Sequence, residues 1–214
     1  MRLILLILLM QFVPLAHSKE RGCLYHLSKF LGSYKNHVLD LRDRELEPHV
    51  AEYVKTYWEH VRDVYERRLK LEPGEINGFM KSSRELTDRT VLITNQIFGI
   101  FNGGVAMVYS SKASELLPFE KATGFILPRK GIGIEITRFV SDHSRDHNLS
   151  RDILETVGKI LEYENVKGTL YAFTSKRHGV LYRRLGIPHK THEISDRDIV
   201  IEFTVRDYIE TLLH

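Results

Sequence analysis

Cysteine is almost absent from this 214-residue chain, in which Cys23 is the single example. A lone cysteine excludes an intrachain disulfide and any metal site built from several cysteines. An excess of charge of one sign is also missing, because 31 Lys and Arg face 28 Asp and Glu and the net charge is only +3. No basic block stands out, so we expect no nucleic-acid partner.

Long hydrophobic runs are absent except at the N-terminus. A positive start is followed by residues 3–16, which are apolar apart from Gln11, and then by small residues in "AHS", 16–18. This order predicts a signal peptide over residues 1–18, removed on export to a periplasmic or extracellular location. An uncleaved membrane anchor is the alternative, although the run is short for a membrane span. We expect the N-terminus to engage the membrane during export in either case.

The rest of the chain has the composition of a globular protein, with 43% hydrophobic and 28% charged residues overall. We expect one domain over residues 48–214, preceded by a polar N-terminal extension, 19–47. Apolar residues at helical spacing predict a helix over 48–69. Residues 90–111 are typical of two strands, with the turn expected at "FNGG", 101–104.

The second half of the chain alternates between strand and helix patterns. We expect strands at 133–141, 168–174 and 198–205, a helix with apolar positions between 153 and 161, a second helix at 175–186, and a short final helix. This order predicts an α/β domain in which a central, mixed and twisted sheet carries helices on both faces.

The strand "GIEITRFVS", 133–141, carries two opposite charges. Side chains alternate along a strand, so Glu135 and Arg138 are expected on opposite faces. A strand covered on both sides has no solvent face for a charge, so these residues are either paired or face a cleft. They could meet one ligand only if a β-bulge turned one of them.

Two stretches resemble the GNAT superfamily of N-acyltransferases. "EITRFVSD", 135–142, is similar to a strand of the acyl-homoserine-lactone synthases and N-acyl amino acid synthases, and "TSKRHGVLYRRLGI", 174–187, is similar to a helix found across the superfamily. The resemblance implies the GNAT fold and an enzyme that moves an acyl group from a thioester donor, acyl-CoA or an acyl carrier protein, to a small-molecule amine. It implies no metal.

The resemblance also implies roles for three residues, each with a structural alternative. Glu135 would be a base or would orient the amine, unless it forms an ion pair with a neighbouring helix. Arg138 would bind a carboxylate or phosphate, unless it caps a loop or pairs with an acid. Tyr182 would protonate the departing thiolate, unless it packs in the core.

The donor site implied by the resemblance lies around the C-terminal end of the same strand. Its residues are Phe139 and Val140 on the strand, Arg145, Asn148 and Ser150 before and within the next helix, and Ser175 at the start of a later helix. A solvated loop around 145–150 and a simple N-cap at Ser175 are the alternatives. The phosphate-binding motif of many relatives, (Q/R)-x-x-G-x-(G/A), lacks its small residues here. This difference favours either the homoserine-lactone synthase branch, with its carrier-protein donors, or a divergent member of the superfamily.

Other interpretations stay open. Coenzyme A thioesters and acyl carrier proteins are cytoplasmic, so an exported protein could instead be a non-catalytic domain that binds an acyl or peptide ligand. His143 and His147 are four residues apart and could share a zinc ion on a helix, although no third ligand is evident. The basic stretch 176–184 could meet an acidic partner or form a solvated face.

Overall fold

The computed structural model describes residues 25–28, 35–42, 47–69, 87–97, 100–141 and 148–214. The expected signal peptide and Cys23 lie outside these ranges. Within them, no helix combines the length and the apolar character that a membrane crossing requires.

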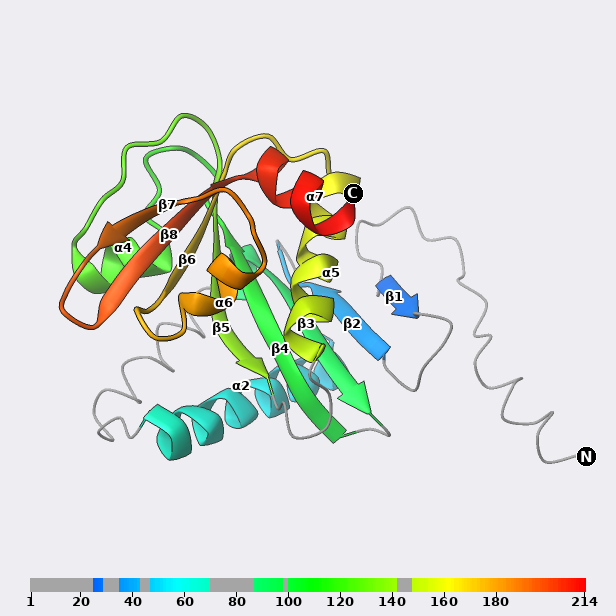
Figure 1. The fold of residues 1–214 in the computed structure, drawn as a ribbon. Coiled ribbons are helices and arrows are strands. Elements are labelled where there is room, and N and C mark those ends of the chain that lie inside the picture. The colour runs from blue at the N-terminus through cyan, green and yellow to red at the C-terminus, as the bar shows by residue number, and fades with distance from the viewer. Residues whose placement is uncertain (1–24, 29–34, 43–46, 70–86, 98–99, 142–147) are drawn as a thin grey trace, which may run out of the picture.

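The described strands form one mixed sheet of eight, as Figure 1 shows, in the order β1-β2-β3-β4-β5-β6-β8-β7. They are β1 (Tyr25–Ser28), β2 (Lys35–Asp40), β3 (Thr90–Ile97), β4 (Ile100–Tyr109), β5 (Gly133–Ser141), β6 (Thr169–Ser175), β7 (Lys190–Glu193) and β8 (Asp198–Thr204). β5 and β6 run parallel, and the other neighbours run antiparallel. The mixed sheet expected from the sequence is therefore confirmed.

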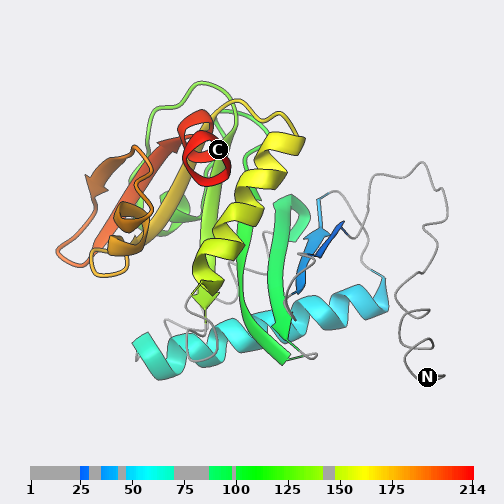
Figure 2. The ribbon, with the colours of Figure 1, turned by 45° about the vertical axis from the view of Figure 1, so that its right-hand side comes forward.

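Helices cover both faces of this sheet (Figures 1 and 2). One face carries α5 (Leu149–Tyr163), α6 (Val180–Arg184) and α7 (Val205–Leu213), which share a core cluster with β4, β5, β6 and β8. The other face carries α2 (Pro48–Leu69) and the short α4 (Pro118–Thr123). A 3₁₀ turn, η1 (Thr87–Arg89), leads into β3.

Alternation along β4 shows how the two cores arise. Val105 and Met107 are buried against α5, whereas Ala106 between them is buried against α2. Successive side chains of a strand point to opposite faces, so a strand covered on both sides is apolar at every position. Each fully buried large apolar side chain contributes roughly 1.5–3 kcal/mol to folding.

The two long helices form where the apolar spacing predicts them. On α5, Ile153, Leu154 and Val157 are fully buried, while Arg151 and Lys159 on the other side are exposed. α2 spans residues 48–69 as expected and buries Tyr57 and its neighbours against the sheet.

The expected hairpin turn at residues 101–104 is wrong, because these residues lie inside β4. The glycines serve close packing instead. A Cβ on Gly104 would lie 2.6 Å from the carbonyl oxygen of Ile93, and one on Gly103 would lie 2.6 Å from that of Val140. Glycine inside a strand often marks such a close backbone approach.

Two further expectations are corrected. Residues 19–47 are not all a separate extension, because β1 and β2 join the sheet and Val38 and Leu39 are buried in its two cores. The helix expected at 175–186 is shorter, since α6 begins only at Val180. The turn before α6 is closed at Ser175, whose Oγ accepts a hydrogen bond from the amide of His178 at 3.2 Å.

Candidate functional site

β5 and β6 separate part-way along their length. Residues 133–136 of β5 pair with residues 169–172 of β6, and there the pairing stops. Beyond it, β5 follows β4 and β6 follows β8. Residues 137–141 therefore diverge from residues 173–175, and the site is built around this divergence.

A β-bulge lies on β5 where the divergence begins. Thr137 pairs with Ala106 and Val140 pairs with Gly104, so two residues of β5, Arg138 and Phe139, oppose one residue of β4. Arg138 has a φ of 58°, in the left-handed region. This conformation costs a residue other than glycine roughly 1–2 kcal/mol, and bulges concentrate next to active sites.

The bulge turns the Arg138 side chain onto the face of Glu135. Its Nη1 donates to Thr137 Oγ1 at 2.7 Å, and its charge interacts with Glu135 and with Tyr57 and Tyr65 of α2. The Tyr57 hydroxyl in turn donates to the Arg138 carbonyl at 2.9 Å. The opposite-face placement predicted by a regular strand is thus wrong, and the bulge that could bring the two residues together is present.

Glu135 is completely buried, with 0% of its surface exposed. Its Oε2 accepts a hydrogen bond from the Phe119 amide at 2.8 Å, and its Oε1 has no hydrogen-bond partner in the described part of the chain. Burial raises the pKa of Glu135 to about 7, against the opposing effects of the Phe119 amide and the Arg138 charge. A carboxyl group with this pKa exchanges a proton readily near neutral pH, as a general base must. Its contact with a helix is an amide of α4, not the ion pair considered from the sequence.

Tyr182 lies on the opposite face of the sheet from Glu135, in the core beneath α6. Its ring is 4% exposed and packs against Phe203 at a centroid distance of 5.6 Å. Burial, and then the neighbouring Tyr65, raise the pKa of Tyr182, so its hydroxyl keeps its proton at physiological pH. The hydroxyl therefore carries the proton that a donor needs, but the raised pKa makes it a weaker acid, and its packing is that of a core residue.

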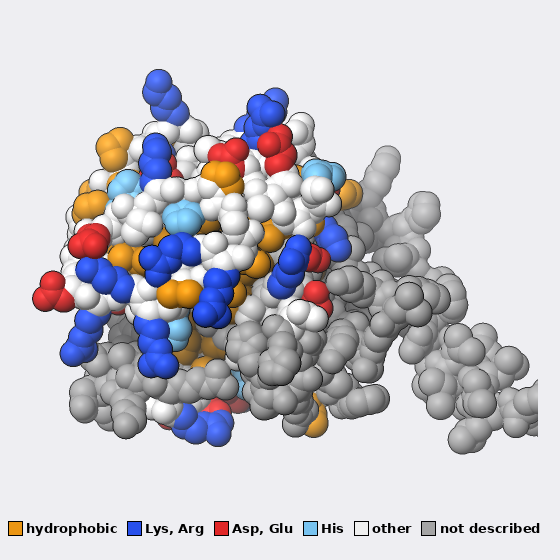
Figure 3. All heavy atoms as spheres, in the orientation of Figure 1, with side chains coloured by type: hydrophobic (Ala, Val, Ile, Leu, Met, Phe, Trp, Pro, Cys, Tyr) orange, Lys and Arg blue, Asp and Glu red, His pale blue; other side chains and the backbone are white. Residues whose placement is uncertain are grey.

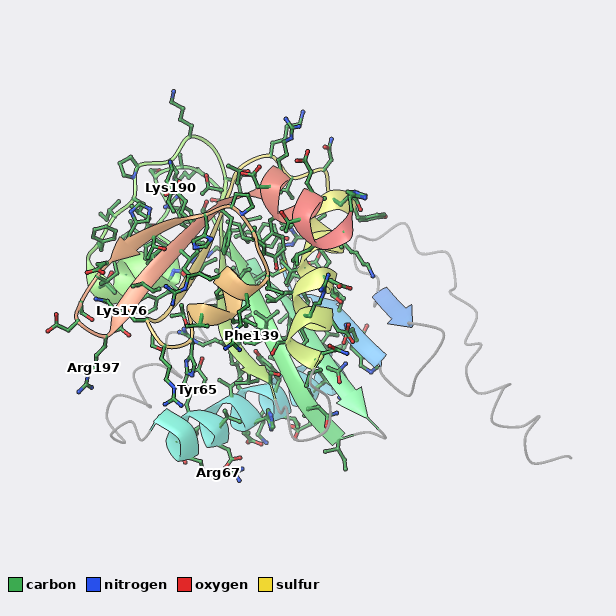
Figure 4. All side chains as sticks on the ribbon, in the orientation of Figure 1. Tyr65, Arg67, Phe139, Lys176, Lys190 and Arg197 are labelled. Carbon is green, nitrogen blue, oxygen red and sulfur yellow. The ribbon has the colours of Figure 1, made fainter. Side chains whose placement is uncertain are left out.

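Tyr65 is a site residue that the sequence did not reveal. Figure 4 shows it between α2 and α6, with Phe139 above it near β5 and α6. Tyr65 interacts electrostatically with Arg138 and Tyr182, so it links the two faces at the divergence. It shares one apolar stripe of α2 with Tyr57 and Val61, and in the sequence that stripe indicates only packing.

The residues expected at the donor site divide into two groups. Phe139 and Val140 lie on β5 within the divergence, with Phe139 packed toward α5 and Val140 buried toward α2. Ser150 is buried, and its hydroxyl bonds the Ser141 hydroxyl at 3.0 Å, so it ties α5 to β5 and does not point outward to a phosphate.

The other residues expected at the donor site either lie next to helix α5 or α6 or fall outside the described residues. Asn148 precedes the first turn of α5, as an N-cap residue does. Ser175 ends β6 and closes the turn before α6, but it is not the N-cap considered from the sequence, because the residue before the first turn of α6 is Gly179. Arg145, together with His143 and His147 of the zinc hypothesis, lies outside the described residues. Within the ranges that are described, no three metal-binding side chains gather.

Basic side chains gather beside the divergence. Residues 175–190 contain no Asp or Glu, and their basic residues are Lys176, Arg177, Arg183, Arg184 and Lys190. Figure 3 shows Lys and Arg side chains spread over the face that carries α6 and β7. Lys176 and Lys190 pair with Glu193 and Glu202, whereas the three arginines have no carboxylate partner among the described residues.

A mixed sheet whose two parallel central strands part beyond a bulge, with helices on both faces, is the fold of the GNAT acyltransferases. The fold expected from the resemblance is therefore confirmed. No protein-family model matches the chain, and no curated protein matches it either.

Solved structures are similar over most of the chain. FeeM, an N-acyl amino acid synthase from uncultured soil microbes, is 12% identical with a TM-score of 0.57, over 84% of this chain and 95% of FeeM. An acyl-CoA N-acyltransferase from Pseudomonas aeruginosa is 15% identical with a TM-score of 0.55, over 80% and 100%. BjaI, a coenzyme A-dependent acyl-homoserine lactone synthase solved with SAM and isopentyl-CoA, is 12% identical with a TM-score of 0.54, over 82% and 85%.

Proposed function

We propose that this protein is an N-acyltransferase that moves an acyl group from a thioester to a small-molecule amine. The observation that carries the proposal is the bulge at Arg138, which sets a buried, titratable Glu135 and an arginine on one face where β5 and β6 diverge. The similarity to solved N-acyltransferases supports it.

The reaction needs a deprotonated amine, a polarised carbonyl and a proton for the leaving thiolate. The amine nitrogen attacks the thioester carbon, the new C–N bond forms and the C–S bond breaks. Glu135 accepts the proton that the amine loses, and Tyr182 supplies a proton to the thiolate sulfur. Backbone amides of β5 at the divergence, near Phe139 and Val140, stabilise the negative charge on the carbonyl oxygen.

The base and the acid lie on opposite sides of the sheet. Glu135 shares its face with α2, whereas Tyr182 shares its face with α5 and α7. In this arrangement the amine would reach Glu135 from one face of the sheet, and the thiolate would leave towards Tyr182 on the other face.

The basic residues around α6 favour an anionic donor. Both the phosphates of coenzyme A and the acidic surface of an acyl carrier protein would be attracted to Arg177, Arg183 and Arg184, which have no carboxylate partner among the described residues. The proposal includes an acyl carrier protein as the donor and export of the protein. The donor assay distinguishes an acyl carrier protein from coenzyme A as the donor.

A direct assay tests the proposal. The full chain is incubated with acyl-CoAs from acetyl to palmitoyl, or with acyl carrier protein thioesters, together with amino acids or S-adenosylmethionine. Thiol release and the amide product are followed by absorbance and mass spectrometry. We expect one donor class to give an amide, and Glu135→Gln to lower kcat by about 10²–10⁴-fold.

Glu210→Gln, on the exposed face of α7, is the matched control and should keep full activity. Binding of acyl-CoA without turnover by any amine would favour a non-catalytic acyl-binding domain. A folded protein that neither binds nor transfers any acyl group would overturn the proposal.

A further inference from the structure

The segment between β4 and β5 holds a second buried carboxylate, Glu120 of α4, which is 1% exposed. Glu120 accepts hydrogen bonds from the Leu117 amide at 2.8 Å and the Leu127 amide at 3.2 Å, and from Arg129 Nη1 at 2.6 Å. Arg129 is itself buried and also donates to the Glu115 carbonyl. Glu120 and Arg129 therefore hold residues 115–120 and residues 127–129 of this segment together.

The segment fixed in this way contacts Glu135 directly. Phe119, the residue before Glu120, donates its amide to Glu135 Oε2 at 2.8 Å. The Phe119 ring packs against Tyr171, the residue opposite Glu135 on β6. The position of the amide therefore depends on the Glu120–Arg129 pair.

The two buried carboxylates have very different surroundings. Glu120 has three N–H donors, one of them cationic, and hydrogen bonds from a charged donor are the stronger ones. Glu135 accepts the Phe119 amide on Oε2, and the nearby Thr137 hydroxyl lowers its pKa, but its Oε1 has no hydrogen-bond partner among the described residues. An oxygen without a partner is costly in a buried site, and a substrate amine bound there would satisfy it.

We propose that Glu120 and Arg129 are positioning residues for Glu135: they hold the Phe119 amide on Oε2 and thereby leave Oε1 to the amine substrate. This inference rests on the proposed function for its catalytic part. The charge of Glu120 also favours the protonated form of Glu135, since two like charges in one buried site oppose each other.

Other titratable groups around Glu135 lie on its own strand, on β6 and on α2. Arg138 lies on its own strand and favours the ionised form. Tyr171 faces it from β6, and Tyr57 and Tyr65 of α2 act on Arg138. Removal of Glu120 changes one member of this set and leaves the rest in place.

The test combines Glu120→Gln with the double variant Glu120→Gln/Arg129→Met, which avoids an unpaired buried arginine. The carboxyl carbon of Glu135 is titrated by NMR in the full chain, and the Phe119 amide proton is followed in the same samples. We expect the Glu135 midpoint to move to higher pH in both variants, because loss of the Phe119 hydrogen bond, which lowers this pKa, outweighs loss of the Glu120 charge, which raises it. In the wild type we expect the chemical shift of the Phe119 amide proton to change with pH at the Glu135 midpoint. In the variants we expect this change to be absent.

Activity provides the second readout. The rise of kcat/KM with pH should shift to higher pH by about half a unit, roughly a threefold loss well below the midpoint, because one pH unit corresponds to a tenfold change. Arg206→Met and Glu210→Gln, which break an exposed ion pair of α7, are the controls and should leave every curve unchanged.

The outcomes separate the two proposals. Variants that fold but leave the Glu135 midpoint and the Phe119 amide unchanged would overturn the positioning role, whether or not the protein is an enzyme. Shifts in the NMR titration with no acyl transfer by the wild type would support the positioning and contradict the proposed function. Active variants with the wild-type pH profile would overturn the positioning role in catalysis.

Discussion

Arg138 Nη1 lies 2.7 Å from Thr137 Oγ1, although neighbouring side chains of a regular strand point to opposite faces. The bulge and the positive φ at Arg138 make this contact possible. The same geometry places the guanidinium within electrostatic reach of Glu135. A local distortion of one strand thus builds the charged part of the site.

Replacement of Glu135 by Gln should remove a pH dependence of stability. The pKa of Glu135 is about 7 in the folded protein and 4.5 for an ordinary glutamate, so the folded state binds this proton more tightly than the unfolded state. The stabilising effect is complete below pH 4.5 and is lost as the pH rises through 7, a change of about 3 kcal/mol. Urea unfolding at pH 5 and pH 8 should show a smaller pH effect in Glu135→Gln. Equal pH effects in the two proteins would contradict the pKa assignment.

Replacement of Arg138 by Gly and by Ala should separate backbone strain from side-chain loss. Both variants lose the guanidinium, but only Gly adopts a φ of 58° without a steric cost. We expect Arg138→Gly to unfold with a free energy about 1–2 kcal/mol higher than Arg138→Ala, and both to lose acyl transfer. The same pair at Asn165, whose φ is 50° on the exposed surface after α5, should show a similar difference with full activity. Equal stability of Arg138→Gly and Arg138→Ala would show that β5 relaxes and that residue 138 does not keep its positive φ.

Replacement of Gly104 and of Gly158 by alanine should change the stability of the protein in opposite directions. At Gly104 the added Cβ would lie 2.6 Å from the Ile93 carbonyl oxygen and 2.8 Å from Tyr57, so we expect a loss of about 1–3 kcal/mol. At Gly158 on α5 the nearest atoms belong to Leu213 at 3.5 Å, and alanine favours the helix by about 0.5–1 kcal/mol. Thermal and urea unfolding measure both changes. A Gly104→Ala protein of wild-type stability would refute the close packing of β4 against α2.

The two tyrosines near the divergence should affect different kinetic constants. Tyr182→Phe removes the proposed proton donor and should lower kcat by about 10²-fold with acyl-CoA, but much less with an acyl thiophenol ester, whose thiolate leaves without help. Tyr65→Phe acts on the side of Glu135 and Arg138 and should mainly raise the KM for the amine. Steady-state kinetics with both donors measure these effects. An unchanged kcat for Tyr182→Phe would show that Tyr182 packs in the core and does not donate a proton.

The sequence predicts the elements with strong periodicity and misses those with weak or conflicting signals. The apolar spacing of the sequence predicts α2, α5 and β5, because burial determines that spacing. β1, β2 and β7 are short, and α4 lies in a proline-flanked stretch that is typical of a loop.

The site is less predictable than the fold. Glu135 and Arg138 are identified by their charge within an apolar strand. A positive φ at an arginine, however, has no sequence signal, and neither has the amide of Phe119 that holds Glu135. The role of the glycines at 103 and 104 was missed because glycine favours turns and close packing equally.

The limited pairing of β5 with β6 has a consequence for how the chain folds. Strands β1 to β5 pair in chain order, and β6, β7 and β8 pair among themselves. Among the described strands, the two blocks pair through the parallel stretch of residues 133–136 and 169–172, across the crossover that contains α5. Parallel pairing over a long connection is slow to form. We therefore expect the two blocks to assemble early and their seam to close last, so that the candidate site is completed only at the end of folding.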